Sequence, residues 1–157
     1  MGMMDSQSVH WGNNHFLRGF GDNKKVKRIK RHVVINKNDY LLAFIINIAC
    51  IHDSKTTFLL VRYLKELCCN IKIIIVDAGY HGEVSERIKN TFGYLLDIID
   101  SGDKVNSFKP IKKRWIIERT FSRFGKDGRL CRNYELTFDS AKEIVKLAKI
   151  RMLLNEI

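Results

Sequence analysis

The sequence lacks the features that mark secreted, disulfide-stabilised and membrane-spanning proteins. None of its four cysteines stands in a Cys-x-x-Cys pair, so we expect free thiols and a cytoplasmic location. The longest apolar run, residues 41–51, is interrupted by Asn47 and is far shorter than the roughly 20 residues of a membrane-spanning helix. No basic segment followed by an apolar stretch begins the chain, as a secretion signal would. The histidines are scattered singly, without zinc-binding spacing. We therefore expect no membrane partner.

The sequence has little proline and fewer acidic than basic residues, which indicates an ordered protein with a negatively charged partner. One proline, 10% aromatic and 45% hydrophobic residues predict an ordered chain with a core, which we interpret as one domain over residues 1–157. Lysine and arginine total 28 against 17 aspartate and glutamate, giving a net charge of +11 and a pI near 9.6. Such an excess favours a polyanionic partner through counterion release at phosphates. Ribosomal and other nucleic-acid-binding proteins share it, so the charge indicates a partner but no chemistry.

Apolar periodicity and turn signals predict elements in the order β-β-β-α-β-α-β-α-α. The first three strands would form an antiparallel meander, and the later strand–helix–strand unit would be parallel with a right-handed crossover. This order predicts an α/β fold of the ribonuclease-H-like type, a mixed sheet of three antiparallel strands followed by parallel βα units with flanking helices. The last helix would open with a capping box at Ser140 and Glu143. The predicted strands are 5–9, 32–35, 41–49, 71–76 and 94–99, and the predicted helices are 57–67, 83–90, 112–124 and a final one from 140.

Three acidic residues occupy special places in this order. Asp5 lies on the first predicted strand, and Glu118 lies on a later helix among lysines and arginines. Asp77 follows the apolar run 71–76, at the strand end where α/β sheets place their ligands. The three residues are 72 (77 − 5) and 41 (118 − 77) positions apart. In a ribonuclease-H-like sheet the first and fourth strands are neighbours and a following helix packs across them. We therefore expect the three carboxylates to converge.

A cluster of three carboxylates suits metal-dependent phosphodiester chemistry. Carboxylate oxygens are ligands for the hard cations Mg²⁺ and Mn²⁺. Two such ions, about 4 Å apart, can activate the attacking oxygen and stabilise the leaving oxygen of a phosphodiester. Nearby lysines and arginines would offset the phosphate charge and favour the ionised carboxylates. On this interpretation Asp5, Asp77 and Glu118 are both metal ligands and catalytic residues.

Each of these features also has an ordinary structural interpretation. Asp77 after a strand could be a turn or helix cap, and Asp5 could be a solvated acid. Glu118 could pair with Arg114 four residues earlier, although Arg before Glu is the weaker orientation on a helix. The basic run 24–31 could be a solvated strand edge. Spacing alone leaves the catalytic and the structural interpretations about equally open.

Four motifs surround the acids in the same order as the predicted elements. Together they resemble the catalytic half of bacterial DDE transposases of the insertion-sequence-five type, and the resemblance extends from Asp5 to about Leu154. The motifs are Asp5-Ser6-Gln7-Ser8-Val9, Lys27-Arg28-x-Lys30-Arg31-His32, Val76-Asp77-x-Gly79-Tyr80 and Arg114-Trp115-x-x-Glu118-Arg119-Thr120-Phe121.

This resemblance implies a ribonuclease-H-like fold and a metal-binding triad of Asp5, Asp77 and Glu118. It implies nicking at transposon ends that depends on Mg²⁺ or Mn²⁺, with two ions at the site. Attack of the freed 3′-hydroxyl on target DNA would follow. The implied partners are therefore transposon-end DNA and target DNA, and the implied location is the bacterial nucleoid within the cytoplasm.

The wider group of such transposases has a tyrosine, an arginine, a glutamate and a lysine around the third acid. Arg114 and Glu118 match this signature. Ile111 stands at the tyrosine position, and Gly125 stands at the lysine position with Lys126 next to it. We expect the departures to affect contacts with DNA ends rather than the triad. The residues expected to contact DNA are Lys24, Lys25, Lys27, Arg28, Lys30, Arg31, Arg114, Arg119 and Lys126.

Full-length proteins that resemble this chain carry a helical region before the first acid. Here Asp5 follows only four residues, so we expect an N-terminally truncated catalytic domain that acts with a missing N-terminal half or as a homo-oligomer. Two other functions stay open at this point. One is an inactive remnant of a transposase that only binds DNA, and the other is a ribonuclease-H-like nuclease that hydrolyses DNA without strand transfer.

Overall fold

The chain alternates strands and helices in the predicted order, with one short strand in addition. The computed structural model describes residues 1–12, 20–21, 24–51, 53–67, 70–77, 83–99 and 114–155. Its strands are β1 (Gly2–His10), β2 (Phe20–Gly21), β3 (Lys24–Asn36), β4 (Leu41–Ile48), β5 (Ile73–Asp77) and β6 (Leu95–Ile99). Its helices are α1 (Asp53–Leu67), α2 (Glu83–Phe92), α3 (Arg114–Lys126) and α4 (Phe138–Leu154).

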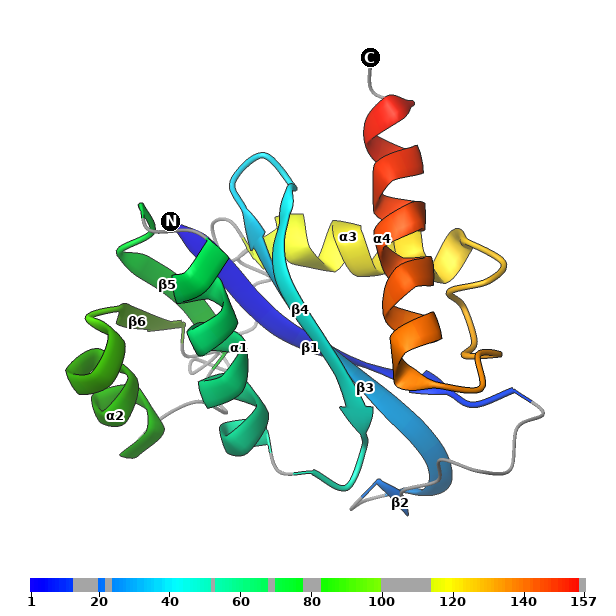
Figure 1. Ribbon diagram of the computed structural model, residues 1–157, viewed down its shortest axis with the longest axis horizontal. Helices are drawn as coiled ribbons and strands as arrows, with labels where there is room; N and C mark the ends of the chain where they lie inside the picture. The colour runs from blue at the N-terminus through cyan, green and yellow to red at the C-terminus, as the bar shows by residue number, and fades with distance from the viewer. Residues whose placement is uncertain are drawn as a thin grey trace, which may run out of the picture.

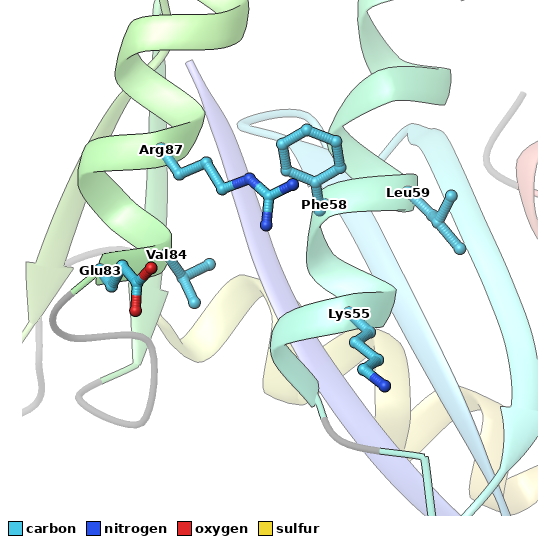
Figure 2. A pocket seen from close by; sticks show the side chains of 6 residues that line it. All are labelled: Lys55, Phe58, Leu59, Glu83, Val84 and Arg87. Carbon is cyan, nitrogen blue, oxygen red and sulfur yellow. The ribbon is translucent and has the colours of Figure 1, made fainter.

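The strands form one mixed sheet in the order β4-β3-β1-β5-β6, with β1 in the middle (Figure 1). β3 pairs antiparallel with β1 and with β4, whereas β5 is parallel to β1 and β6 is parallel to β5. This is the ribonuclease-H-like arrangement of an antiparallel meander followed by parallel βα units, so the predicted fold class is confirmed. β2, which the apolar pattern did not predict, pairs with the first residues of β3.

β3 is longer than the sequence predicts because the basic run continues the strand. The apolar pattern predicts residues 32–35, whereas residues 29–35 pair with β1 on one side and with β4 on the other. The interpretation of the basic run as a solvated strand edge is therefore wrong for residues 29–31. Successive residues of a strand point to opposite faces of the sheet, so neighbouring basic side chains of this run do not crowd one another.

The two faces of the sheet bury separate hydrophobic cores because successive strand residues point to opposite sides. Met3 packs into a core with α3 and α4, whereas its neighbour Met4 packs into a core with α1 and α2. We call these sides the α3–α4 face and the α1–α2 face. Helices α1 and α2 lie side by side, with α1 against β3 and β4 and α2 against β6 (Figure 1). Residues 3, 5 and 7 of β1 therefore share the α3–α4 face, which is where the candidate acids are expected.

The N-cap of the last helix lies three residues before the predicted capping box. Thr137 is the N-cap of α4, and its hydroxyl oxygen accepts a hydrogen bond from the Ser140 N–H at 3.1 Å. An N-cap side chain satisfies the N–H of the third helical residue, so Ser140 holds that third position instead of the cap. No described helix is both long enough and apolar enough to cross a membrane.

Candidate active site

The parallel pairing of β1 with β5 makes two of the candidate acids neighbours. Gly2 pairs with Ile74 and Met3 with Ile75, an offset of 72 residues (74 − 2). Continued by two residues, the same offset sets Asp5 beside Asp77 (77 − 5 = 72). Adjacent strands lie about 4.8 Å apart, and residues in register project from the same face of the sheet. Asp5 and Asp77 are thus 72 positions apart in the sequence, the same offset as the residue pairs between β1 and β5.

Asp5 and Asp77 also line one small cavity of about 20 Å³ on the α3–α4 face. Both residues are half-buried. The Ser6 N–H donates a hydrogen bond to Asp5 Oδ1 at 2.7 Å, which holds this carboxylate close to its own strand. The cavity is closed by apolar residues of the flanking elements, Met3, Met4, Ile75, Val76, Ile99 and Ile117.

Glu118, the third candidate acid, lies on α3 beside this cavity. Its neighbour Ile117 lines the cavity and is 2% exposed, whereas Glu118 is on the exposed side of the helix. Gln7, two residues after Asp5, donates a hydrogen bond from Nε2 to the Phe121 carbonyl at 3.4 Å, which brings this part of α3 against β1. In the part of the chain that the structure describes, no three His, Cys, Asp or Glu side chains form a group able to hold a metal ion. Convergence of all three acids therefore stays a prediction.

The Asp5–Asp77 pair has the chemistry that a divalent cation requires. Two carboxylates side by side repel each other, and a bound cation relieves that repulsion. Their oxygens are hard donors of the kind that Mg²⁺ and Mn²⁺ prefer. The pair therefore fits a metal ion with these two residues as ligands, and Glu118 on α3 is the candidate for a third ligand.

Two residues of the basic run that were predicted to contact DNA are partly accessible and already make contacts. Lys30 Nζ lies 2.8 Å from Asp53 Oδ1 at the start of α1. Arg28 Nη2 lies 3.2 Å from His10 Nε2 on β1. Both belong to β3 and, being two residues apart, project from the same face of the strand. Lys24, Lys25 and Lys27 also lie on β3, but their side chains are outside the described residues.

Arg31 is a buried structural residue, not the exposed DNA contact that the sequence predicts. Its side chain is 2% exposed, and Nη1 donates a hydrogen bond to the Leu130 carbonyl at 2.6 Å. Burial lowers the pKa of the guanidinium to about 10, partly offset by the nearby Cys131 and Asp127. Arg31 points to the α3–α4 face because it alternates with Lys30 on the strand.

His32, the last residue of the same motif, points to the opposite face. It is 1% exposed, and its Nε2 lies 3.9 Å from Asp53 Oδ1. Burial lowers the pKa of the imidazole, and the negative charge of Asp53 opposes that shift. We therefore expect a neutral, structural histidine.

The cations of α3 fall into two groups. Arg119 lies over the Trp115 ring with its guanidinium carbon 4.8 Å from the ring centroid, and its Nη2 lies 3.8 Å from Asp39 Oδ2. Lys126 is exposed at the end of the helix and lines an open cavity of about 320 Å³ with Arg123 and Arg151. Arg114 is the first residue of α3, and its side chain is outside the described residues. Arg119 and Lys126 thus remain accessible to DNA.

Sequence reasoning missed one group of charged residues beside the site. Asp39, to which the sequence analysis assigns no role, is 2% exposed and contacts Thr120, Arg123 and Lys149. A signal was present in the spacing of Arg119 and Arg123, which share one face of α3 at i and i+4. Gly79, Tyr80, His81 and Ile111, which belong to or flank the motifs, lie outside the described residues.

The sequence matches one family model along nearly its whole length. A model described as a transposase DDE domain matches residues 2–153. No curated protein matches the chain.

Two solved structures show a weaker likeness. The piggyBac transposase synaptic complex with hairpin DNA, solved by cryo-electron microscopy, is 16% identical over 69% of this chain and 24% of its own, with a TM-score of 0.40. The strand transfer complex of the Drosophila P element transposase is 11% identical over 63% of this chain and 25% of its own, with a TM-score of 0.33. The chain thus spans about a quarter of the length of these two proteins. Likenesses of this size are too small to bear on function.

Proposed function

Because the chain belongs to the family of transposase DDE domains, we propose that it is the catalytic domain of a DNA transposase, an enzyme that cuts and rejoins DNA with divalent metal ions. The observation that carries this proposal is the parallel register that sets Asp5 beside Asp77 on the face covered by α3. A solvated surface acid, the ordinary interpretation of Asp5, would not need a second carboxylate on the neighbouring strand. Two carboxylates that line one cavity from neighbouring strands offer a pair of hard oxygen ligands to a divalent cation.

We assign the metal ligands to Asp5, Asp77 and Glu118, with Mg²⁺ or Mn²⁺ as the ion and two ions at the site. Bound there, such ions would supply Lewis-acid activation of the attacking oxygen and charge stabilisation of the leaving oxygen. Asp5 and Asp77 would supply the fixed wall of the site, because both lie on central strands. Glu118 would supply the third ligand from α3, a helix that packs against β1.

The cations of the chain support DNA as the partner. The net charge is +11, and binding of a phosphate backbone would release counterions, so affinity should fall steeply with salt. Arg119 and Lys126, which follow Glu118 on α3, would contact the strand that is cut. Lys30 and Arg28 project from the opposite face of the sheet and would contact a more distant part of the DNA. We further propose the insertion-sequence-five type, with transposon ends and target DNA as substrates.

Nicking of supercoiled plasmid by the purified chain tests the proposal. We expect nicking that requires Mn²⁺ or Mg²⁺ and that disappears in Asp77→Asn and in Glu118→Gln. The matched control is Asp139→Asn, which removes an exposed carboxylate from the start of α4 and should nick like the unmodified chain. Strand transfer from a pre-nicked transposon end then separates a transposase from a nuclease that only hydrolyses DNA.

A second candidate is a DNA-binding domain without catalysis. The observation that favours it is the absence, among the described residues, of a three-ligand metal group. It predicts salt-sensitive plasmid binding with no nicking at any metal concentration. Nicking that is metal-dependent and lost in Asp77→Asn would exclude this candidate.

A further inference from the structure

Asp39, in the turn between β3 and β4, is a buried carboxylate that joins three parts of the chain. It is 2% exposed and has a φ of 65°, a left-handed conformation that aspartate and asparagine tolerate better than most residues. The Thr120 hydroxyl of α3 donates a hydrogen bond to its Oδ1, and Lys149 Nζ of α4 lies 3.1 Å from the same oxygen. Oδ2 accepts a hydrogen bond from Arg123 Nη1 of α3 at 3.1 Å.

The contacts of Asp39 with Thr120 and Lys149 are shielded from solvent, so dissolved salt screens them poorly. Thr120 is 0% exposed and Lys149 is 4% exposed. A charge-assisted hydrogen bond in such a place is stronger than one between neutral groups. Salt screens buried pairs much less than exposed ones. Apolar packing alone allows a helix to turn or slide slightly, whereas a bond of fixed direction does not.

The contacts hold one flank of α3, and Glu118 lies on another. Arg119 and Arg123, four residues apart, share the flank that faces Asp39. Glu118 and Phe121, three residues apart, share a flank, and the Phe121 carbonyl accepts a hydrogen bond from Gln7 on β1. The helix is therefore held on one side by the β3–β4 turn and on the other by the strand that carries Asp5.

We propose that Asp39 is a positioning residue of the candidate active site. By holding α3 against rotation about its axis, it sets how far Glu118 reaches toward Asp5 and Asp77. This inference rests on the proposed function, since it concerns the same three acids. A misplacement of about 1 Å can lower the rate of a reaction about 100-fold, so a fixed helix matters more here than for packing alone.

The test compares two variants that remove the clamp without leaving a buried unpaired charge. Asp39→Asn combined with Lys149→Met removes the carboxylate and its buried cation together, and leaves the net charge unchanged. Thr120→Val removes only the hydroxyl that α3 donates to Asp39, with little change of shape. The matched control is Asp127→Asn with Arg151→Met. It removes another carboxylate–cation pair, 2.5 Å long, that joins the end of α3 to α4.

The first readout is Mn²⁺ affinity of the DNA-free protein, measured by calorimetry, with plasmid affinity and nicking measured beside it. We expect both clamp variants to stay folded and to bind plasmid like the unmodified chain. Loss of a residue that orients a ligand typically lowers metal affinity about 10- to 100-fold, and we expect Mn²⁺ affinity to fall within that range for the double variant and less for Thr120→Val. The control variant Asp127→Asn with Arg151→Met should change neither Mn²⁺ affinity nor plasmid affinity.

The outcomes separate this inference from the proposed function. If the unmodified chain binds Mn²⁺ and nicks DNA while both folded clamp variants do so equally well, Asp39 has no positioning role and the proposed function stands. If the control pair lowers Mn²⁺ affinity as much as the clamp variants do, loss of any carboxylate–cation pair at α3 and α4 has the same effect and the assignment to Asp39 is wrong. If the unmodified chain binds no Mn²⁺, both proposals fall.

Discussion

The two faces of the sheet differ in the kinds of side chain that they bury. The α1–α2 face is filled by aliphatic side chains such as Leu60, Leu64 and Ile88, each 0% exposed. Its buried polar side chains include Asn47 and Thr56, which hydrogen-bond to each other, and His32 near Asp53. The α3–α4 side has an apolar core too, but it also buries four charged residues, Arg31, Asp39, Asp127 and Lys149, at 9% exposure or less.

Buried charges add little net stability compared with apolar residues of the same size, because desolvation offsets the attraction. Among the described residues these buried charges lie on one side, which points away from stability and toward geometry. That side is also the one on which Asp5, Asp77 and Ile117 of α3 line one cavity. We infer that both apolar cores stabilise the fold and that the buried charges of the α3–α4 side hold the site in shape.

The largest loss of stability should follow removal of the Asp39 carboxylate alone. Asp39→Ala leaves Lys149, 4% exposed, without its counter-ion. Breaking a buried pair from one side costs about 3–5 kcal/mol of unfolding free energy. Urea denaturation measures it. The double variant Asp39→Asn with Lys149→Met should recover most of the loss, and if it does not, the unpaired ammonium is not the cause.

A loss of similar or slightly smaller size should follow a cavity on the opposite face. Leu64→Ala removes a side chain that is 0% exposed in the α1–α2 core, and such changes lower the free energy of unfolding by about 2–5 kcal/mol. Mn²⁺ affinity of the remaining folded protein should stay unchanged, in contrast to the clamp variants. Leu67→Ala, at a residue 68% exposed, is the control. Weaker Mn²⁺ binding by Leu64→Ala would contradict the division between the two faces.

Replacement of Arg31 should have a moderate effect on stability and none on DNA binding. Arg31→Met keeps the length of the side chain but leaves the Leu130 carbonyl without its donor, a loss of about 1–3 kcal/mol. Plasmid affinity, measured by gel shift at several salt concentrations, should equal that of the unmodified chain because Arg31 is buried. Lys126→Met, which removes an exposed cation from the same side, should weaken plasmid binding. Equal weakening by both variants would contradict the structural role of Arg31.

The smallest effect should be a dependence of stability on pH that arises from His32. Burial lowers the pKa of His32 below its usual 6.5, so the unfolded chain takes up a proton at a higher pH than the folded one. The contribution of His32 is therefore constant above pH 6.5, and stability is lost as the pH falls below that value toward the folded pKa. Thermal unfolding at pH 7.5 and at pH 5.5 measures the difference. His32→Asn should reduce it, while His10→Asn, at an exposed position, should not.

The order of the strands and the pairing of two acids could be read from the sequence because both depend on local patterns. Apolar runs bounded by turns predicted the elements, and the strand–helix–strand unit predicted β6 as parallel to β5. The place of β5 beside β1 followed from the ribonuclease-H-like order of the elements. Asp5 and Asp77 then followed from their places on those strands. Errors at the edges came from competing local signals, as when Thr137 caps α4 in place of Ser140.

The charged side of the molecule could not be read in the same way. Asp39 meets Thr120, 81 positions away, and Lys149, 110 positions away (149 − 39), and no local pattern encodes such a contact. Arg31 lies in a run of basic residues that reads as solvated, and only pairing of β3 on both sides shows that it is buried. Contacts between side chains of distant elements depend on how the helices pack, which periodicity leaves undetermined.

The place of β1 in the middle of the sheet has a consequence for how the chain folds. β1 needs β3 on one side and β5 on the other, and β5 ends only at Asp77. During synthesis the hairpin of β3 and β4 can pair at once, whereas the parallel edge of β1 must wait until residue 77 has left the ribosome. Pairing across such a sequence distance is slow because the entropy of closing the loop is lost before the contacts between the strands form. The pocket formed by Asp5 and Asp77 is therefore completed after the meander, late in the assembly of the sheet.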